Sequence, residues 1–259
     1  MTSNIPIQVR TALQNLGLPA PMLAWIQSAL PNRNPLPPMP ALIATVKTRL
    51  LALDLTIPGI LEQPVPAFPP NLHNPEVREI KLSRDTLVQV RDIENLSRSK
   101  WEQVEDLEAI ARGEQTRGRE IIRLNENENE NGNENEDEDD ANNDQPQPRP
   151  APAPATAAGS RAAAAAASKN ATHRLLLQDC RGQTLHGLEL KRVERIGIGT
   201  MSIGEKILLK RGTVVARGVV LLEPATCTVF GGKVDAWHRA WVESRLARLK
   251  EAAGADARR

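Results

Sequence analysis

Two cysteines and two histidines in the C-terminal third of the chain are the residues best suited to metal chemistry. Zinc is bound by thiolate and imidazole groups, and Cys180, His186, Cys227 and His238 together supply such a set. No close C-x-x-C or H-x-x-x-H pair nucleates a site, however. The two cysteines are therefore expected to pack as small apolar side chains, with zinc as the weaker alternative.

Two glycine-rich stretches invite comparison with phosphate-binding loops. The stretch at 197–204, GIGTMSIG, has the wrong glycine spacing for a dinucleotide fingerprint and lies in no βαβ pattern, so it is expected to be a loop. Gly231-Gly232-Lys233 is followed by Val234, where a phosphate loop needs Ser or Thr to hold magnesium. Neither stretch predicts nucleotide binding.

Covalent catalysis finds no support in the sequence either. No nucleophile elbow or Ser/His/Asp order is present. Tyrosine is absent altogether, which excludes a tyrosine nucleophile of the kind that topoisomerases use to cleave DNA. The sequence thus predicts a protein that is not an enzyme and that needs no cofactor.

The net charge of +1 conceals a strong asymmetry along the chain. Residues 125–144 contain ten carboxylates and no Lys or Arg. The other residues then carry 33 basic side chains against 22 acidic ones. A basic body with an acidic segment indicates an electrostatic partner, either nucleic acid or the acidic face of a protein, unless the charges only solvate the surface.

The elements that must position such charges begin with three short helices in residues 5–55, punctuated by proline. Ser3 or Asn4 is a candidate cap for the first helix, and Gly17 follows its end. Apolar residues recur at helical spacing in each segment. They are Val9, Ala12, Leu13 and Leu16 in the first, Met22, Trp25, Ile26, Ala29 and Leu30 in the second, and Leu42, Ile43, Val46, Leu50 and Leu53 in the third. Because such short helices are marginal alone, they are expected to pack together, with Met22 and Trp25 in their core.

The middle of the chain alternates between ordered and unstructured patterns. Six prolines between Pro58 and Pro75 predict a connector, followed by a strand around 86–93. Residues 97–113 predict a helix capped by Ser97 or Ser99, and 119–124 reads as another strand start. The Asn/Glu, Pro and Ala tracts of 125–171 cannot bury enough apolar surface to offset chain entropy and are expected to be disordered.

Strand patterns resume after this insertion. Four strand-like segments, HRLLLQD, TLHGLEL, KILLK and TVVARGVVLLEP, are separated by turn signals and predict a barrel or a sandwich. An amphipathic helix with Val234, Trp237, Trp241, Val242, Leu246 and Leu249 on its apolar stripe is expected to end the fold. The predicted domains are 1–57 (helical), 58–79 (connector), 80–124 (first part of the barrel), 125–171 (insertion), 172–252 (second part with the C-terminal helix) and 253–259 (a frayed tail).

Composition also limits the cellular context. No apolar run is long enough to span a membrane, no secretory signal is visible, and two cysteines fit a reducing compartment.

Single-stranded nucleic-acid binders stack bases on aromatic side chains of their strands. None of the six aromatic residues lies in the four late strand segments, which favours a protein-binding barrel over a nucleic-acid binder.

Several motifs resemble the RecQ-mediated genome instability protein 1 family. They are Gln178-Asp179 after a leucine-rich strand, Gly187 with Glu189, Gly204 with Lys206, R-G-x-x-L-L-x-P from Arg217 to Pro224, and Gly231-Gly232-x-Val234-Asp235. TRLLALDL, from Thr48 to Leu55, resembles the end of the family's N-terminal helical domain. The resemblance covers roughly 5–124 and 172–250, and it implies an α+β protein in which a three-helix domain precedes an OB-fold barrel.

This resemblance also implies a function and its partners. The family's OB-fold subunits bind topoisomerase III in the nucleus and, with a RecQ-family helicase, dissolve double Holliday junctions. A loop between the first two barrel strands reaches the topoisomerase gate and favours decatenation, and here 125–171 occupies that place. A second small OB-fold subunit is a further candidate partner, and any DNA contact is expected to be weak or indirect. The tudor-domain partner of topoisomerase IIIβ is the alternative relative, disfavoured because the chain ends at Arg259.

Six residues are candidates for partner contact: Lys206, Lys210, Arg217, Arg119, Leu124 and Arg174. Lys206 begins a strand in which Ile207 and Leu209 should point inward, so its ammonium group is expected to be exposed.

Overall fold

We analysed a computed structural model, which describes residues 4–32, 35–113, 115–116, 119–120 and 171–254. The insertion predicted over 125–171 therefore lies, apart from Ala171, outside the described residues. The chain forms two compact units, Met1–Val104 with Asn170–Arg259, and Glu105–Lys169. Each unit is described by itself. Among the described residues, none of the helices is both long and apolar enough to span a membrane.

The three predicted N-terminal helices are confirmed as α1 (Ile5–Asn15), α2 (Leu23–Ala29) and α3 (Met39–Leu51). Asn4 is the N-cap residue of α1, although its side chain makes no capping hydrogen bond. The best-buried side chains come from the expected stripes: Val9, Leu13, Ile26, Leu42, Val46 and Leu50. The core position expected for Met22 is wrong, since this side chain is 40% exposed, and Trp25 is only partly buried. A two-turn helix such as α2 offers one narrow buried stripe, which Ile26 and Ala29 fill.

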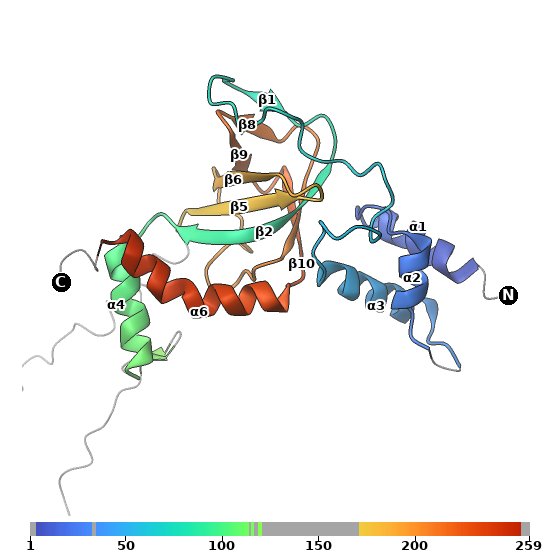
Figure 1. The fold of residues 1–259 in the computed structure, drawn as a ribbon, viewed down its shortest axis with the longest axis horizontal. Coiled ribbons are helices and arrows are strands. Elements are labelled where there is room, and N and C mark those ends of the chain that lie inside the picture. The colour runs from blue at the N-terminus through green and yellow to red at the C-terminus, as the bar shows by residue number, and fades with distance from the viewer. Residues whose placement is uncertain (1–3, 33–34, 114, 117–118, 121–170, 255–259) are drawn as a thin grey trace, which may run out of the picture. The chain divides into compact units, whose positions relative to one another are not determined.

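The second half of the fold is one curled sheet of eight strands, which favours the barrel over the sandwich (Figure 1). Its order is β1-β8-β9-β6-β5-β2-β7-β10. The strands are β1 (Ile80–Lys81), β2 (Thr86–Asn95), β5 (His173–Asp179), β6 (Thr184–Glu189), β7 (Lys206–Leu209), β8 (Val214–Ala216), β9 (Val219–Leu222) and β10 (Cys227–Gly231). All pairs are antiparallel except β6 with β9.

The late strand pattern needs two corrections. The segment predicted as one strand from Thr213 to Pro224 is the hairpin β8–β9, because Arg217 and Gly218 adopt positive φ angles that turn the chain. β10 was not predicted at all. Its five residues include Cys227, Thr228 and a terminal glycine, so no clear hydrophobic alternation marks it.

β2 is buried on both of its faces over its first five residues. Val88 and Val90 belong to the barrel core, whereas Leu87 belongs to the core of the helical domain. β7 repeats this arrangement, with Ile207 in the barrel core and Leu208 packed against the helical core. The helical domain therefore covers the outer face of the barrel at these strands, and α3 lies beside β10 (Figure 1).

The proline-rich connector has no helix or strand, as expected, yet it is an ordered part of the core. Its Val65 packs in the helical core, while Phe68 and Leu72 pack in the barrel core. The carboxylate of Asp179, at the end of β5, accepts a hydrogen bond of 2.9 Å from the Phe68 amide. One buried carboxylate thus attaches the connector to the barrel.

Two further helices agree with the sequence pattern. α4 (Lys100–Ala111) begins with a capping box, in which Ser99 Oγ accepts from the Glu102 amide at 3.1 Å and Glu102 Oε2 accepts from the Ser99 amide at 2.8 Å. α6 (Asp235–Ala252) packs Trp237 and Trp241 against the barrel core. Val242, expected on the same stripe, is exposed.

Close backbone contact between the helical domain and the barrel explains why one position of the Gly231-Gly232 pair is glycine. Gly232 has φ +95°, and a Cβ there would lie 2.3 Å from the Leu51 carbonyl oxygen at the end of α3. Gly212 has φ +90° with open space around it, so it shares the backbone strain without the clash.

We expect Gly232→Ala to lower the free energy of unfolding by about 1 to 3 kcal/mol more than Gly212→Ala does, because overpacking adds to the cost of positive φ. Urea denaturation of both variants measures this difference. Equal losses would mean that α3 does not pack this closely on the barrel.

Candidate partner-binding surface

The insertion lies within the segment that connects β2 to β5, and a polar network joins the two ends of that segment, which we call the root of the insertion. Glu94 on β2 forms ion pairs with Arg174 on β5, at 2.7 Å, and with Lys100 at the start of α4, at 3.3 Å. The Thr172 amide donates to Ser97 Oγ at 2.8 Å, and the Leu96 amide donates to the Thr172 carbonyl oxygen. The barrel thus holds Leu96 and Ser97 beside Thr172, at the two ends of the segment that connects β2 to β5.

The buried carboxylate of Glu189 contacts the start of β5. His173 Nδ1 is 2.7 Å from Glu189 Oε2 on β6, and Glu189 Oε1 accepts from Arg192 at 2.9 Å. Burial raises the pKa of Glu189, but the hydrogen bonds from His173 and from the Val193 amide outweigh it and hold the pKa below its usual range. The contacts of Glu189 with the His173 amide and ring thus fix the start of β5.

The proposed contact residues do not form one site. Arg174 pairs in register with Glu94 near the end of β2, whereas Lys210 follows Leu209, the partner of Thr86 at its start. At about 3.3 Å per residue, the ten residues of β2 place these ends roughly 30 Å apart. Lys210 and Arg217 are both exposed, and both follow strands at the end of the barrel that carries β1 and β8.

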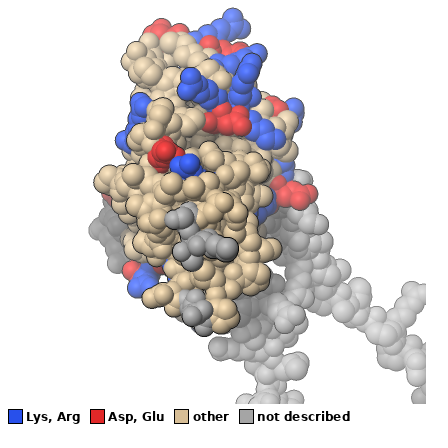
Figure 2. Space-filling model, turned by 90° about the vertical axis from the view of Figure 1, so that its right-hand side faces the viewer, with Lys and Arg blue, Asp and Glu red and all other residues tan. Residues whose placement is uncertain are grey.

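This end of the barrel is rich in basic side chains. Figure 2 shows Lys and Arg gathered over the upper part of the molecule, where β1 and β8 lie in Figure 1, while the face of the helical domain is largely uncharged. Exposed basic residues there are Lys81, Arg84, Lys210, Arg211 and Arg217. The sequence analysis identified two of them.

Lys206 is not a surface residue, and the expectation of an exposed ammonium group is wrong. Its side chain has 0% exposure, and Nζ donates to the Gly204 carbonyl oxygen at 2.6 Å. Ile207 and Leu209 do point inward as expected. The opposite face of β7, however, meets the helical domain instead of water. Lys206→Glu would therefore disturb the core and is no test of partner contact.

The remaining two candidates belong to the other unit. Arg119 begins β4 (Arg119–Glu120), which pairs with β3 (Gln115–Thr116) in a short hairpin. Leu124 lies outside the described residues. Their contact with a partner remains a prediction.

The aromatic side chains offer little surface for stacking of bases. Phe230 lies on β10, so the expectation that the barrel strands carry no ring is corrected, but this ring packs against the helical core. Trp237 is covered by the Arg91 guanidinium, 3.7 Å from the ring centroid, and Trp241 donates to Asp92. Trp101, 52% exposed, is the only large aromatic among the exposed hydrophobic residues described.

The four residues considered for zinc are not brought together. Cys227 is buried in the barrel core, whereas Cys180 packs on the helical core and His186 is exposed. Burial raises the pKa of Cys227 to about 11, which keeps it as an uncharged thiol. Within the described ranges, no group of three His, Cys, Asp or Glu side chains is placed to hold a metal ion.

Comparison with known proteins agrees with this architecture. Residues 68–245 match the family model described as "RMI1, N-terminal OB-fold domain", which is more than half of the chain. The chain belongs to the RecQ-mediated genome instability protein 1 family. The protein of that name from Schizosaccharomyces pombe is 38% identical over 73 residues, which is 28% of this chain and 30% of the relative. The match thus spans less than a third of the relative's length, and the helical domain precedes the residues matched by the model.

The motifs that carry the family resemblance mostly maintain the fold. A Cβ at Gly187 would lie 2.9 Å from the Leu177 side chain, and one at Gly204 would lie 2.5 Å from the Val234 amide nitrogen. Asp179 and Glu189 are buried and hydrogen-bonded. Glu94 was not identified from the sequence, and Ser97 was considered only as a helix cap; the polar run that precedes α4 is the signal that could have revealed both as root residues.

Lys206 gives this fold a specific dependence on pH. Burial lowers its pKa from 10.5 to about 8, and the carboxylates of Asp54 and Glu205 offset only part of that shift. Between pH 8 and 10.5 the folded protein releases this proton while the unfolded chain retains it. Stability therefore gains from Lys206 deprotonation as the pH rises through this window.

We expect the stability of the native protein relative to Lys206→Met to increase by roughly 2 kcal/mol from pH 7.5 to pH 10. Urea unfolding of both proteins at each pH measures this change. Groups that both proteins share titrate alike, so their contributions cancel when the two free energies of unfolding are subtracted. An unchanged difference would place the ammonium group in water.

Proposed function

We propose that this chain is a non-catalytic scaffold subunit that binds topoisomerase III and a RecQ-family helicase in the nucleus. In this role it stimulates decatenation and the dissolution of double Holliday junctions. The match of residues 68–245 to the family's OB-fold model carries the proposal. Family membership supports a scaffold role in genome maintenance, and the partners follow from the family resemblance. A second small OB-fold subunit is a candidate third partner.

The geometry around the insertion supports this role. β2 and β5 are neighbouring strands, and the segment that connects them, which contains the insertion, begins and ends at a root held by Glu94, Ser97 and Arg174. A segment attached at two adjacent, rigid points can be presented to a partner while the barrel supplies a separate binding surface. The buried carboxylates of Asp179 and Glu189 accept hydrogen bonds from backbone amides, which supports a role for them in the fold.

Deletion of residues 127–165 tests whether the barrel provides binding to topoisomerase III and the insertion provides stimulation of decatenation. We expect the shortened protein to fold with little change in stability, since closure entropy changes by only about 0.6 kcal/mol per doubling of loop length. It should still co-purify with topoisomerase III but should stimulate decatenation much less. Unfolding of the deletion variant, or full stimulation by it, would contradict the proposal.

Single-stranded nucleic-acid binding is the alternative function, and the basic end of the barrel favours it. The ring of Phe230, which packs partly buried against the helical core, and the covered ring of Trp237 argue against a stacking platform. We expect the chain without residues 127–165 to bind labelled single-stranded DNA only weakly, with a Kd on the order of 10⁻⁴ to 10⁻⁶ M that rises with salt. Fluorescence anisotropy at two salt concentrations measures this, and nanomolar, salt-resistant binding would establish the alternative.

A further inference from the structure

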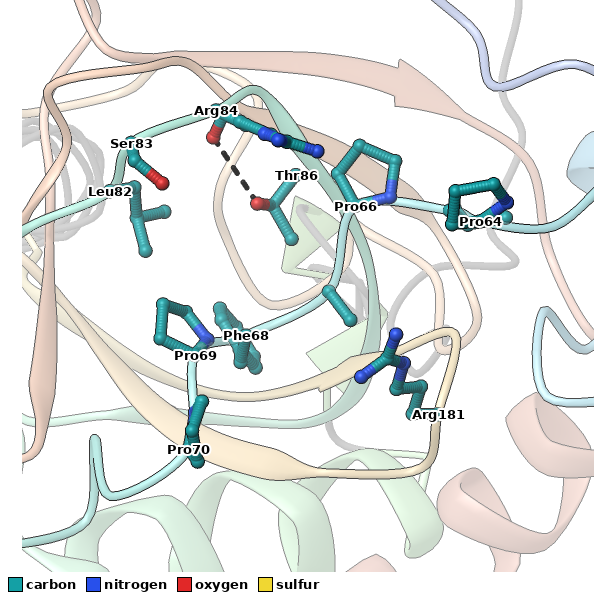
Figure 3. Close-up of a pocket in the computed structure, with 12 residues that line it drawn as sticks. Pro64, Pro66, Phe68, Pro69, Pro70, Leu82, Ser83, Arg84, Thr86 and Arg181 are labelled. Atoms are coloured by element: carbon teal, nitrogen blue, oxygen red, sulfur yellow. Dashed lines mark hydrogen bonds between the residues drawn. The ribbon is translucent and has the colours of Figure 1, made fainter.

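A recessed cavity of about 320 Å³ lies between the connector and two turns of the barrel (Figure 3). Four prolines of the connector form one wall, together with Phe68. The turn between β1 and β2 supplies Ser83, Arg84 and Thr86, and the turn between β5 and β6 supplies Arg181. In Figure 3, Arg84 lies above the connector at Pro66 and Arg181 lies below it.

The charge of this cavity is one-sided. Its twelve lining residues include two arginines and no Asp or Glu. Both arginines are exposed, and neither forms an ion pair with any residue that the structure describes. The neighbouring Asp85 does not line the cavity, and its carboxylate accepts from the Arg211 amide at 2.7 Å. Among the described residues neither guanidinium group has an ion-pair partner, so the cavity is suited to an anionic group.

The walls of the cavity are held in place before any ligand binds. Asp179 accepts from the Phe68 amide with one oxygen, and with the other from the Arg181 and Gln183 amides at 2.9 and 2.8 Å. This one carboxylate thus fixes both the proline wall and the turn that carries Arg181. On the other side, Leu82 exchanges backbone hydrogen bonds with Thr213 and Gly212. Binding here would need little ordering of the backbone, and such preorganisation favours affinity.

The chemistry of the walls discriminates between anions. Phosphate sites in proteins are typically lined by backbone N–H groups, and proline residues have none to offer. Proline and phenylalanine instead present apolar surface beside the guanidinium groups, which bind carboxylates through paired N–H donors. A cavity of this volume admits a few side chains but no nucleic-acid duplex.

We propose that this cavity binds a short acidic peptide of a partner protein, with a carboxylate between Arg84 and Arg181 and a neighbouring apolar side chain against the proline wall. The site is separate from the root of the insertion, because Arg181 follows the end of β5 and Arg174 lies at its start. The proposal does not depend on which protein supplies the peptide.

The test measures binding of a fluorescein-labelled peptide of Asp-Asp-Leu repeats to the full chain by anisotropy. We expect Arg84→Gln and Arg181→Gln each to weaken binding about tenfold or more, because each removes a charge-assisted hydrogen-bond donor from the carboxylate. Arg239→Gln is the matched control, since Arg239 is an exposed arginine of α6 that does not line the cavity. Ser83→Phe keeps both charges but fills the cavity, and it should also abolish binding.

Three results would overturn the proposal. Loss of binding in Arg239→Gln equal to that in Arg84→Gln would reduce the effect to general surface charge. Equal binding of an Asn-Asn-Leu peptide would exclude carboxylate recognition. Competition by inorganic phosphate or by single-stranded DNA at the same concentration as the acidic peptide would assign the cavity to phosphate groups. Circular dichroism of each variant verifies that a loss of binding is not a loss of fold.

Discussion

The side chain of Gln89 joins the helical domain to the barrel, and the rest of the fold depends on this junction. Its carbonyl oxygen accepts from the Leu55 amide at 3.0 Å, and its amide donates to Asp54 at 2.7 Å and to Gln178 at 3.1 Å. Gln89 has no exposure to solvent, so each of these bonds replaces one to water. An apolar residue here would leave the Leu55 amide without this partner at the domain junction.

This junction decides which surfaces remain available to a partner. It covers the outer face of β2, β7 and β10, including Phe230 and the whole of Lys206. Asp54 contributes twice: its carboxylate accepts a hydrogen bond from Gln89, and its negative charge favours the charged form of the Lys206 ammonium group. What stays open are the root of the insertion, the basic end near β1 and β8, and the Arg84–Arg181 cavity. Recognition at these three places would use turns and strand ends, which vary more easily than a packed face.

Glycine residues allow this close packing at a few specific points. Gly232 meets the backbone of Leu51, and Gly204 meets the backbone of Val234. A side chain at either position would force two main-chain segments apart. The family motifs therefore preserve backbone approach and buried hydrogen bonds, and the residues that bind partners need not lie within those motifs.

Much of the architecture follows from local patterns in the sequence. The helices α1, α3 and α6, the helix start at Ser97 or Ser99 and the strand around 86–93 depend on neighbours in the chain, so these elements were predicted, although Val242 of the α6 stripe is exposed and Ser99 alone forms the cap. β10 was missed because its alternation is weak, and the turn at Arg217 and Gly218 was hidden within a continuous apolar run. The glycine motifs were identified as non-catalytic, but their packing role depends on residues far away in sequence.

Burial at the candidate site was decided by the tertiary structure alone. The alternation in β7 established that Ile207 and Leu209 face the barrel core, and it placed Lys206 on the opposite face. It could not reveal that this face is covered by a domain whose sequence lies more than a hundred residues earlier. In the same way, Arg84 and Arg181 belong to ordinary turns in the sequence and become one cavity only because Asp179 ties the connector to the barrel. Sequence periodicity specifies which way a side chain points, whereas long-range packing determines whether it meets water, protein or a cavity.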